Sequence, residues 1–477
     1  MPDLTPPFSI TLPDTDGDSE LECRRAVRSL PGKRLVCAGR FQDQDVYAKL
    51  YFNTRKARRG WAREQRGIGH LHTAGIPTPR LLYSGYSPQG NCHVLVLAAI
   101  APAITLNQAW NNTTGREDRE TLLKRMARVF AEHHNTGIVQ NDPHLNNFLV
   151  TGDAIYTLDG ADICRHKHPL RARPSLQNLA AFFSIVYSRQ DGMERIFFDE
   201  YAAASDITLR GDDYRTFTNR TLETRDRNIR KYLKNKIFRE CTAFSRERSF
   251  NRLVMLSRHY DSPGIQQLIS APGDFLHSKS AKTLKLGNTA TLASVHIDGR
   301  NIVIKHYRVK GTLHGLRKAC LRSRAESSWI NAHRLQRYGI YTAPPVALIM
   351  NTIGPFRLDS YFITEHVPGP NAADFFNSSA VSMTDKAVLA DKLFILLKRL
   401  AANRLHHGDL KATNFIISGM EPALLDLDSM QQYRSHTSSF RHAFKKDLQR
   451  FKRNWDSGSE IGALLHELTD KIAREFL

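Results

Sequence analysis

The sequence lacks an apolar run long enough to span a membrane. Its longest apolar stretch, Val94–Ile104, is about half of the ~20 residues that a membrane-spanning helix needs. We expect this stretch to be a buried strand and the turn after it. The N-terminus is acidic and rich in proline, without a basic start followed by an apolar segment. The sequence therefore predicts no signal peptide.

Cysteine is also scarce. Six cysteines are spread over the 477 residues with no close pair: Cys23, Cys37, Cys92, Cys164, Cys241 and Cys320. This spacing matches neither a zinc ligand set nor a disulfide framework, so a reducing compartment fits best. Hydrophobic residues make up 41% of the chain and charged residues 24%, which excludes wholesale disorder. The length allows two or three domains of roughly 150 residues each.

Negative charge is in short supply. The chain has 68 lysines and arginines against 47 acidic residues, giving a net charge of +21. This excess favours an anionic partner, such as nucleic acid, an acidic membrane surface or a phosphorylated substrate. Basic and apolar residues alternate over Arg225–Glu240, which predicts a helix with one cationic face. No zinc-finger, RNA-recognition or helix-turn-helix signature is present, so we expect no nucleic-acid partner.

One segment of the chain occurs twice. Asn141–Asp159 and Gly408–Asp426 align without gaps, and their apolar residues coincide as well as their polar ones. The polar pairs are Asp142 with Asp409, Asn147 with Asn414 and Asp159 with Asp426, each 267 positions apart (409 − 142 = 267). A repeat of this length indicates a duplicated domain rather than a solenoid.

The elements before each copy also correspond. Each half has a strand with one lysine (Val46–Tyr51, Ile302–Tyr307), a basic helical stretch ending in a Gly-Pro turn, further strands, and an amphipathic helix (Asp118–Gly137, Asp385–Leu405). We therefore expect an α+β fold of two tandem protein-kinase-like domains, each with a small β-rich lobe and a larger helical lobe. Turn-forming residues at Ser270–Ser280 predict the boundary. The expected parts are a tail (1–22), a first domain (23–270) and a second domain (271–477).

The repeated polar residues suit phosphoryl transfer. The reaction needs a carboxylate for the hydroxyl proton, oxygen ligands for magnesium, and a lysine, fixed by a carboxylate, for the phosphates. The second half has the H-x-D-x-x-x-x-N then D spacing of a kinase catalytic loop. We predict Asp409 as the operating base beside His407, Asn414 and Asp426 as magnesium ligands, and Lys305 with Glu326 as the ATP-binding pair.

The first half supplies a similar set. We predict Asp142 as its base, Asn147 and Asp159 as its metal ligands, and Lys49 with Glu64 as its ion pair. Two positions depart from the second half, which has His407 and Glu365 where the first has Gln140 and Ala98. The change at the histidine position makes the first domain the better pseudokinase candidate.

Several assignments rest on weaker patterns. Glu64 lies 11 residues before Gly75, whereas Glu326 lies 13 before Gly339, so the copies are out of register there and a solvated helix glutamate is the alternative. Four other histidines, His133, His134, His144 and His406, are expected in loops or on helix surfaces. The loops Leu30–Arg40 and Leu284–Ser294 lack a G-x-G-x-x-G pattern, which favours a divergent kinase over a strict protein kinase.

These segments carry a family resemblance. VYAKLY, GIPTP and NDPHLNNFLV in the first half, with IVIKHY, GIYTAPP and HHGDLKATNFII in the second, resemble the lipopolysaccharide core kinases, which share the protein-kinase fold. The resemblance covers most of both halves except the tail and the region around 190–275. It implies an ATP- and Mg²⁺-dependent kinase that phosphorylates a heptose or Kdo hydroxyl of the inner core, on lipopolysaccharide or a lipid-linked sugar. It also implies a cytoplasmic protein, and we expect the basic surface to hold it either to the anionic inner membrane or to already phosphorylated core.

Two alternatives stay open at this point. One is a pseudokinase that scaffolds envelope assembly without turnover. The other is a kinase with a protein or an antibiotic as acceptor, because such enzymes share the catalytic-loop spacing. The sequence makes no prediction of an oligomeric state.

Overall fold

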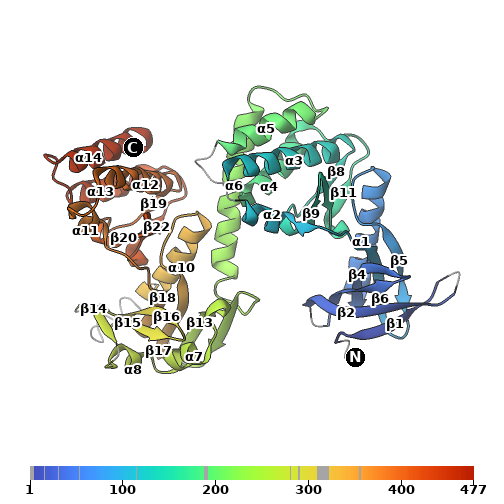
Figure 1. The fold of residues 1–477 in the computed structure, drawn as a ribbon, viewed down its shortest axis with the longest axis horizontal. Helices are drawn as coiled ribbons and strands as arrows, with labels where there is room; N and C mark the ends of the chain where they lie inside the picture. The colour runs from blue at the N-terminus through green and yellow to red at the C-terminus, as the bar shows by residue number, and fades with distance from the viewer. Residues whose placement is uncertain are drawn as a thin grey trace. The chain divides into compact units, whose positions relative to one another are not determined.

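The computed structural model describes residues 5–14, 17–30, 32–52, 54–113, 115–186, 192–279, 281–287, 290–308, 322–353 and 356–477. The chain divides into two compact units, Met1–Asp226 and Arg227–Leu477 (Figure 1). Each unit mixes helices with strands, which confirms the predicted α+β class. Five of the six cysteines are described and all five are free, while Cys320 lies outside the described residues. Within the described part of the chain, none of the helices combines the length and the apolar character needed to span a bilayer.

The first unit begins with an antiparallel sheet. In spatial order its strands are β1 (Phe8–Leu12), β2 (Ser19–Leu30), β3 (Arg34–Phe41), β4 (Gln44–Phe52), β6 (Cys92–Ala98) and β5 (Leu81–Ser87). Val94, Leu95 and Val96 are fully buried in β6, as expected for this apolar stretch. The prediction of a tail over residues 1–22 was wrong for Phe8–Leu12, because β1 pairs with β2 and buries Ile10 and Leu12 in the sheet core.

The helical part of the first unit follows. It contains α1 (Arg55–Thr73), α2 (Leu106–Asn112), α3 (Arg116–Asn135), α4 (Ala172–Val186), α5 (Met193–Ala204) and the start of α6 (Asp213–Asn235). Short strands lie between them: β7 (Ile104–Thr105), β8 (Ile138–Gln140), β9 (Phe148–Thr151), β10 (Ala154–Thr157) and β11 (Ile163–Arg165). The apolar stripe of α3 packs on α4 and α5 through Phe130, Phe182 and Phe197, whose rings lie 5.0 to 6.4 Å apart.

The second unit contains the larger sheet. In spatial order its strands are β12 (Phe244–Arg248), β13 (Arg252–Ser257), β17 (Pro345–Ile353), β18 (Phe356–Glu365), β16 (Arg300–Tyr307), β15 (Ala290–Ile297) and β14 (Lys282–Leu286). Helix α10 (Arg324–Arg337) packs on this sheet through the fully buried Trp329. The helices α7 (Pro263–Ser270) and α8 (Pro272–Leu276) share a separate apolar cluster with the sheet.

The domain boundary lies earlier than expected. The turn-rich stretch does not separate the units, and Pro272–Leu276 within it form α8 inside the second unit. Strand β13 pairs with β17, so the β12–β13 hairpin belongs to the second sheet. The end of α6 belongs there too, because Ile229 and Leu233 share a core with Trp329. The predicted boundary at 270/271 is therefore wrong, and the units divide at 226/227.

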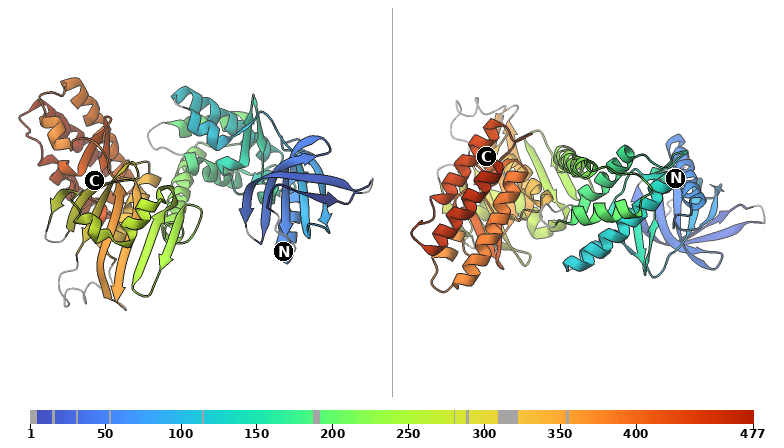
Figure 2. Two further views of the ribbon diagram at one scale, coloured as in Figure 1. Left: turned by 60° about the horizontal axis from the view of Figure 1, so that its bottom comes forward. Right: turned by 90° about the horizontal axis from the view of Figure 1, so that it is seen from above.

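The rest of the second unit is helical. It comprises α11 (Ala372–Asn377), α12 (Met383–Ala402), α13 (Ser438–Lys452) and α14 (Glu460–Phe476), with the short strands β19 (Leu405–His406), β20 (Phe415–Ser418), β21 (Glu421–Leu424) and β22 (Gln431–Gln432). The longer helices lie side by side in orange and red (Figure 2). In both units a run of five neighbouring strands corresponds, β2-β3-β4-β6-β5 in one and β14-β15-β16-β18-β17 in the other.

Candidate active site

The repeated motif occupies the same succession of elements in both units. In the first unit it runs through β8, a 3₁₀ turn (Leu145–Asn147), the hairpin β9–β10 and a second turn (Gly160–Asp162). In the second it runs through β19, a turn (Ala412–Asn414), the hairpin β20–β21 and a turn (Leu427–Ser429). The short hairpin brings the end of the motif back beside its beginning, so each predicted base lies near its predicted metal ligands.

The asparagine closes the loop in the same way in both units. Asn147 Nδ2 donates to the Asp142 carbonyl at 2.9 Å, and Asn414 Nδ2 donates to the Asp409 carbonyl at 2.7 Å. Because the amide nitrogen is used in this way, the amide oxygen of each asparagine is left to face a ligand.

Cationic groups surround the Asp409 carboxylate. Arg450 Nη2, on α13, lies 2.5 Å from its Oδ1, and Lys411 Nζ lies 3.3 Å from its Oδ2. Sequence reasoning missed both cations. Lys411 could have been found from its place two residues after the base, whereas Arg450 lies beyond the motif and carries no signal of its own.

His407 and Gln140 fill the same structural role. His407 Nε2 donates to the Leu425 carbonyl at 2.9 Å, and its Nδ1 accepts from the Asp409 amide at 3.3 Å. Gln140 Nε2 donates to the Leu158 carbonyl at 3.0 Å, and its Oε1 accepts from the Asp142 amide at 3.2 Å. Both side chains are fully buried. Both side chains therefore hold the loop from inside the fold, and Gln140 makes the same two backbone contacts in the first unit that His407 makes in the second.

A buried polar side chain on the helix behind each loop holds its backbone. Asp447, on α13, accepts from the amides of His407 at 2.6 Å and Gly408 at 3.0 Å. Burial raises the pKa of Asp447 to about 6 against the opposing effect of these hydrogen bonds. In the first unit Asn178, on α4, donates to the Gln140 carbonyl at 2.7 Å. Sequence reasoning did not identify either residue.

The first-unit lysine has the predicted partner. Lys49 Nζ, on β4, lies 2.5 Å from Glu64 Oε1, on α1, and the Glu64 side chain is fully buried. Tyr51 donates to Glu64 Oε2 at 3.3 Å, and the Gly160 amide donates to Oε1 at 3.1 Å. Burial opposes ionisation of Glu64, but the Lys49 ammonium prevails and lowers the pKa of this carboxyl. One carboxylate thus joins the strand lysine, α1 and the turn after Asp159.

The second-unit lysine does not have the predicted partner. Lys305 Nζ forms an ion pair with Asp426 and lies 3.9 Å from Asp428 Oδ2. Glu326 instead lies 3.0 Å from Arg357 Nη1, with Arg322 at 3.8 Å. The Lys305–Glu326 pair was wrong because the first turn of α10 places Glu326 toward these arginines.

The predicted metal-binding aspartates share an unusual backbone. Asp159 and Asp426 both adopt the left-handed conformation, with φ of 58° and 62°. Asp159 Oδ1 is buried without a hydrogen-bond partner, and burial together with Glu64 raises the pKa of Asp159 to about 6. For Asp426, burial acts in the same direction, but the Lys305 ammonium prevails and lowers its pKa.

These residues fit a magnesium ion that is shared with a nucleotide. The orphaned Asp159 carboxylate oxygen and the amide oxygens of Asn147 and Asn414 are the kinds of ligand that hold Mg²⁺ against phosphates. The described residues contain no cluster of three or more His, Cys, Asp or Glu that would hold a metal by itself. A bound metal would therefore need Asn147 with Asp159, or Asn414 with Asp426, together with ligand oxygens.

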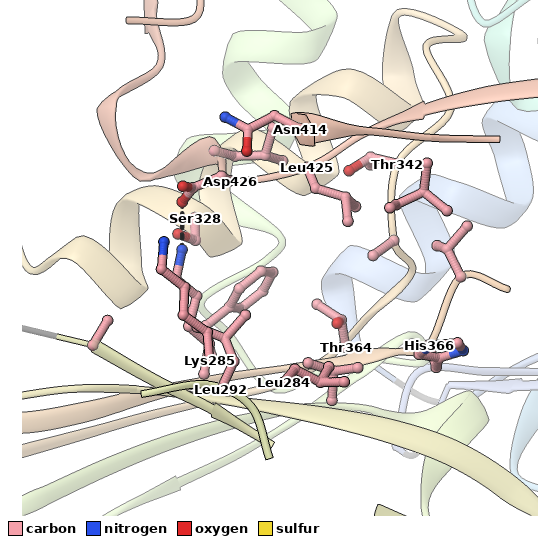
Figure 3. Close-up of a pocket in the computed structure, with 18 of the residues that line it drawn as sticks. Leu284, Lys285, Leu292, Ser328, Thr342, Thr364, His366, Asn414, Leu425 and Asp426 are labelled. Atoms are coloured by element: carbon pink, nitrogen blue, oxygen red, sulfur yellow. Dashed lines mark hydrogen bonds and ion pairs between the residues drawn. The ribbon is translucent and has the colours of Figure 1, made fainter. Parts of the chain in front are cut away.

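The second unit has a pocket of about 530 Å³ between its sheet and the motif. At one end lie Asn414, Asp426 and Ser328, and at the other lie Thr364 and His366 (Figure 3). Apolar side chains line its two walls: Leu284, Leu292, Val303, Ala343, Val367, Ile416 and Leu425. The pocket thus offers a polar end that suits phosphates and apolar walls that suit an aromatic base.

Glu365 lines this pocket and also contacts a residue outside it. Its Oε2 accepts from Tyr260, on the turn before α7, at 2.6 Å. The backbone of the segment follows the same course in both units, since His366 donates to the Asn301 carbonyl at 2.8 Å and Ala99 donates to the Asp45 carbonyl at 2.9 Å. Replacement of Glu365 by Ala98 therefore leaves this backbone segment intact.

Comparison with known proteins identifies one matching family. The model of the lipopolysaccharide kinase (Kdo/WaaP) family matches residues 33–192 and 277–474, one segment in each half of the chain. The matched segments contain both copies of the motif and both strand lysines. No curated protein matches the chain.

Proposed function

The chain belongs to the lipopolysaccharide kinase (Kdo/WaaP) family. From this premise we propose that it transfers the γ-phosphoryl group of ATP to a sugar hydroxyl, heptose or Kdo, of the lipopolysaccharide inner core. We also propose that each unit has a protein-kinase-like fold, with the nucleotide between the sheet and the helical part. The observation that carries the proposal is the pair of catalytic loops closed by identical hydrogen bonds, Asn147 to Asp142 and Asn414 to Asp409.

The residues of the second unit divide the work of the reaction. Lys305 binds the α- and β-phosphates, while Asn414 and Asp426 hold Mg²⁺, which supplies charge for the phosphate oxygens. Asp409 accepts the proton of the acceptor hydroxyl. The hydroxyl oxygen bonds to the γ-phosphorus as the bond between the γ-phosphorus and the β-phosphate oxygen breaks. Asp142, Asn147, Asp159 and Lys49 have the same roles in the first unit.

The surroundings of Asp409 favour an anionic acceptor. Arg450 and Lys411 both contact its carboxylate, and both side chains are partly exposed, at 53% and 32%. A phosphate or carboxylate on the acceptor sugar would share these cations and bring its hydroxyl to the base. This charge favours a core sugar over an aminoglycoside antibiotic, which is itself cationic.

Mass spectrometry of core oligosaccharide tests the proposal. We expect core phosphate to fall in cells that lack the protein, and wild type to restore it. If only Asp409→Asn fails to restore it, the second unit is the core kinase and the first is a pseudokinase. If each of Asp142→Asn and Asp409→Asn loses a different phosphate, both units are enzymes. An unchanged core in every strain would refute the sugar-kinase proposal.

We further propose that the second unit binds the anionic inner-membrane surface through α6. Arg227, Arg230, Lys231 and Lys234 are exposed on this helix, while Ile229 and Leu233 are buried. Each such cation near an acidic bilayer contributes about 1 kcal/mol, and salt screens the attraction. This surface would bring the active site to a lipid-linked acceptor.

Vesicle sedimentation tests the membrane proposal. We expect binding to vesicles with acidic lipid, none to purely zwitterionic vesicles, and release as salt rises. Lys231→Glu/Lys234→Glu should abolish the binding. Lys471→Glu/Arg474→Glu, which makes the same charge change on α14, should retain most of it. Binding that is insensitive to salt would contradict the proposal.

A further inference from the structure

The two units differ in where the carboxylate beside the strand lysine comes from. Helix α1 supplies Glu64 to Lys49 in the first unit. In the second, the lysine meets Asp426 and Asp428, which both follow β21, and it meets no carboxylate from α10 among the described residues. Asp426 is also the predicted metal ligand. A lysine with 12% of its side chain exposed needs another counter-charge when that aspartate is engaged elsewhere.

The glycine after each helix sets the register between α1 and α10. Glu64 lies 11 residues before Gly75, and the residue 11 before Gly339 is Ser328 (339 − 328 = 11). The contacts agree with this alignment. Tyr51 donates to Glu64, and Tyr307 shares a hydrogen bond of 2.9 Å with Ser328 Oγ. The second unit thus has a serine where the first has its helix glutamate.

A second position on the same helices supports this register. Gly67 lies eight residues before Gly75, and a Cβ there would come within 1.8 Å of the Gly160 carbonyl. Asn331 lies eight before Gly339 and donates to the carbonyls of Leu427 and Met430 at 2.8 and 2.9 Å. Both helices therefore contact the turn after the metal-binding aspartate through the same position.

The Asp428 carboxylate makes charged contacts that the Ser328 hydroxyl cannot make. Its side chain is only 8% exposed, and Arg324 lies 2.6 Å away through Nη2 and 2.8 Å away through Nε. Arg324 is in the first turn of α10, so the chain Lys305–Asp428–Arg324 connects the strand lysine to this helix. The first-unit position that aligns with Asp428 is Ala161 (428 − 267 = 161). The first unit thus has Glu64 with Ala161, and the second has Ser328 with Asp428.

We propose that Asp428 is the positioning residue for Lys305, and that it takes the place of the helix glutamate of the first unit although it lies in the turn after β21 and not on the helix. This inference rests on the proposed function, since it assigns Lys305 to nucleotide phosphates. Asp428 keeps a negative charge beside Lys305 when Asp426 engages a metal. Through Arg324 it also holds α10 against the turn that carries both aspartates.

Nucleotide binding by the full-length chain tests this role. Lys49→Ala serves as the parent, so that binding reports the second unit, and Mg-ATP affinity is measured by calorimetry without any acceptor. We expect Asp428→Asn to weaken affinity on the order of tenfold, because a buried charge pair loses one partner. Adding Ser328→Glu should restore affinity to within about threefold of the parent, because it returns the carboxylate to the helix. Glu326→Gln should leave Mg-ATP affinity unchanged, because Glu326 pairs with Arg357 and not with Lys305.

The restoration separates positioning from a general structural role. A variant that lost affinity only through misfolding would melt at a lower temperature and would not recover with a second charge change. Unchanged affinity in Asp428→Asn, failure of Ser328→Glu to restore it, or no Mg-ATP binding by the parent would each overturn the inference. An unchanged core oligosaccharide beside the expected binding pattern would refute only the sugar-kinase proposal.

Discussion

Gln140 and His407 show that two residues of different chemistry can hold the same loop. Each donates to the carbonyl before the metal-binding aspartate and accepts from the amide of the base. We predict that Gln140→His leaves the first unit intact. Gln140→Ala removes both bonds and should lower its free energy of unfolding by about 1–3 kcal/mol. Urea denaturation measures the difference, and equal stability of Gln140→Ala and wild type would contradict it.

The same residues show what sequence can predict about the site. The repeat at constant offset predicted aspartates and asparagines that the structure places in matching loops, because both copies share the same backbone hydrogen bonds and the same left-handed aspartate. The partner of Lys305 was not predictable by the same means. The sequence favours Glu326 as the carboxylate of the helical stretch, whereas the register set by Gly339 places Ser328 at the position of Glu64. Asp428 and Arg450 act through contacts between elements, which leave no local pattern.

At the scale of elements, α3 buries two histidines that we expected on the surface. His133 forms a hydrogen bond with the Thr157 hydroxyl at 3.0 Å. His134 forms hydrogen bonds with the Tyr201 hydroxyl at 2.8 Å and the Asn178 side chain at 3.1 Å. Burial lowers the pKa of His133 to about 3 and that of His134 to about 4. Their surroundings could not be read from α3 alone, because α4, α5 and β10 provide them.

These histidines should make the first unit sensitive to acid. The unfolded chain takes up protons below pH 6.5, whereas the folded unit does not until about pH 3–4, so stability is lost as pH falls through that window. At pH 5 each histidine should lower the free energy of unfolding by about 2 kcal/mol relative to its value at neutral pH. His133→Gln cannot take the proton and should reduce the slope of unfolding free energy against pH. An unchanged slope in this variant would refute the prediction.

The misplaced boundary also belongs to the scale of elements. The turn-forming residues at 270–280 predicted a domain boundary, but Pro272–Leu276 among them form α8, and turn residues do not say which elements pair across them. Strand β13 joins the second sheet only through β17, which lies far along the chain. Local composition therefore predicted the strands and helices of both repeats well, and it failed where long-range pairing assigns a hairpin to one unit.

At the scale of the whole molecule, each unit carries its own strand lysine and its own predicted metal-binding aspartate. Lys49 and Asp159 belong to the first unit, Lys305 and Asp426 to the second, and neither set draws on the other. We therefore predict that one chain binds two Mg-ATP, measured by equilibrium dialysis. Lys49→Ala and Lys305→Ala should each leave one site, because the phosphates lose their main counter-charge, and the double variant should leave none.

The control for this stoichiometry is Lys471→Ala, which removes the same charge from α14 and should leave both sites. Two sites in Lys305→Ala would contradict the assignment of that lysine to phosphates. A single site in the wild type, lost in Lys305→Ala and kept in Lys49→Ala, would make the first unit a pseudokinase despite its intact Lys49–Glu64 pair. The opposite pattern would mean that the exchange of Glu64 for Asp428 had cost the second unit its nucleotide. Two sites in the wild type, with one left in each single lysine variant, would mean that both carboxylate arrangements support nucleotide binding.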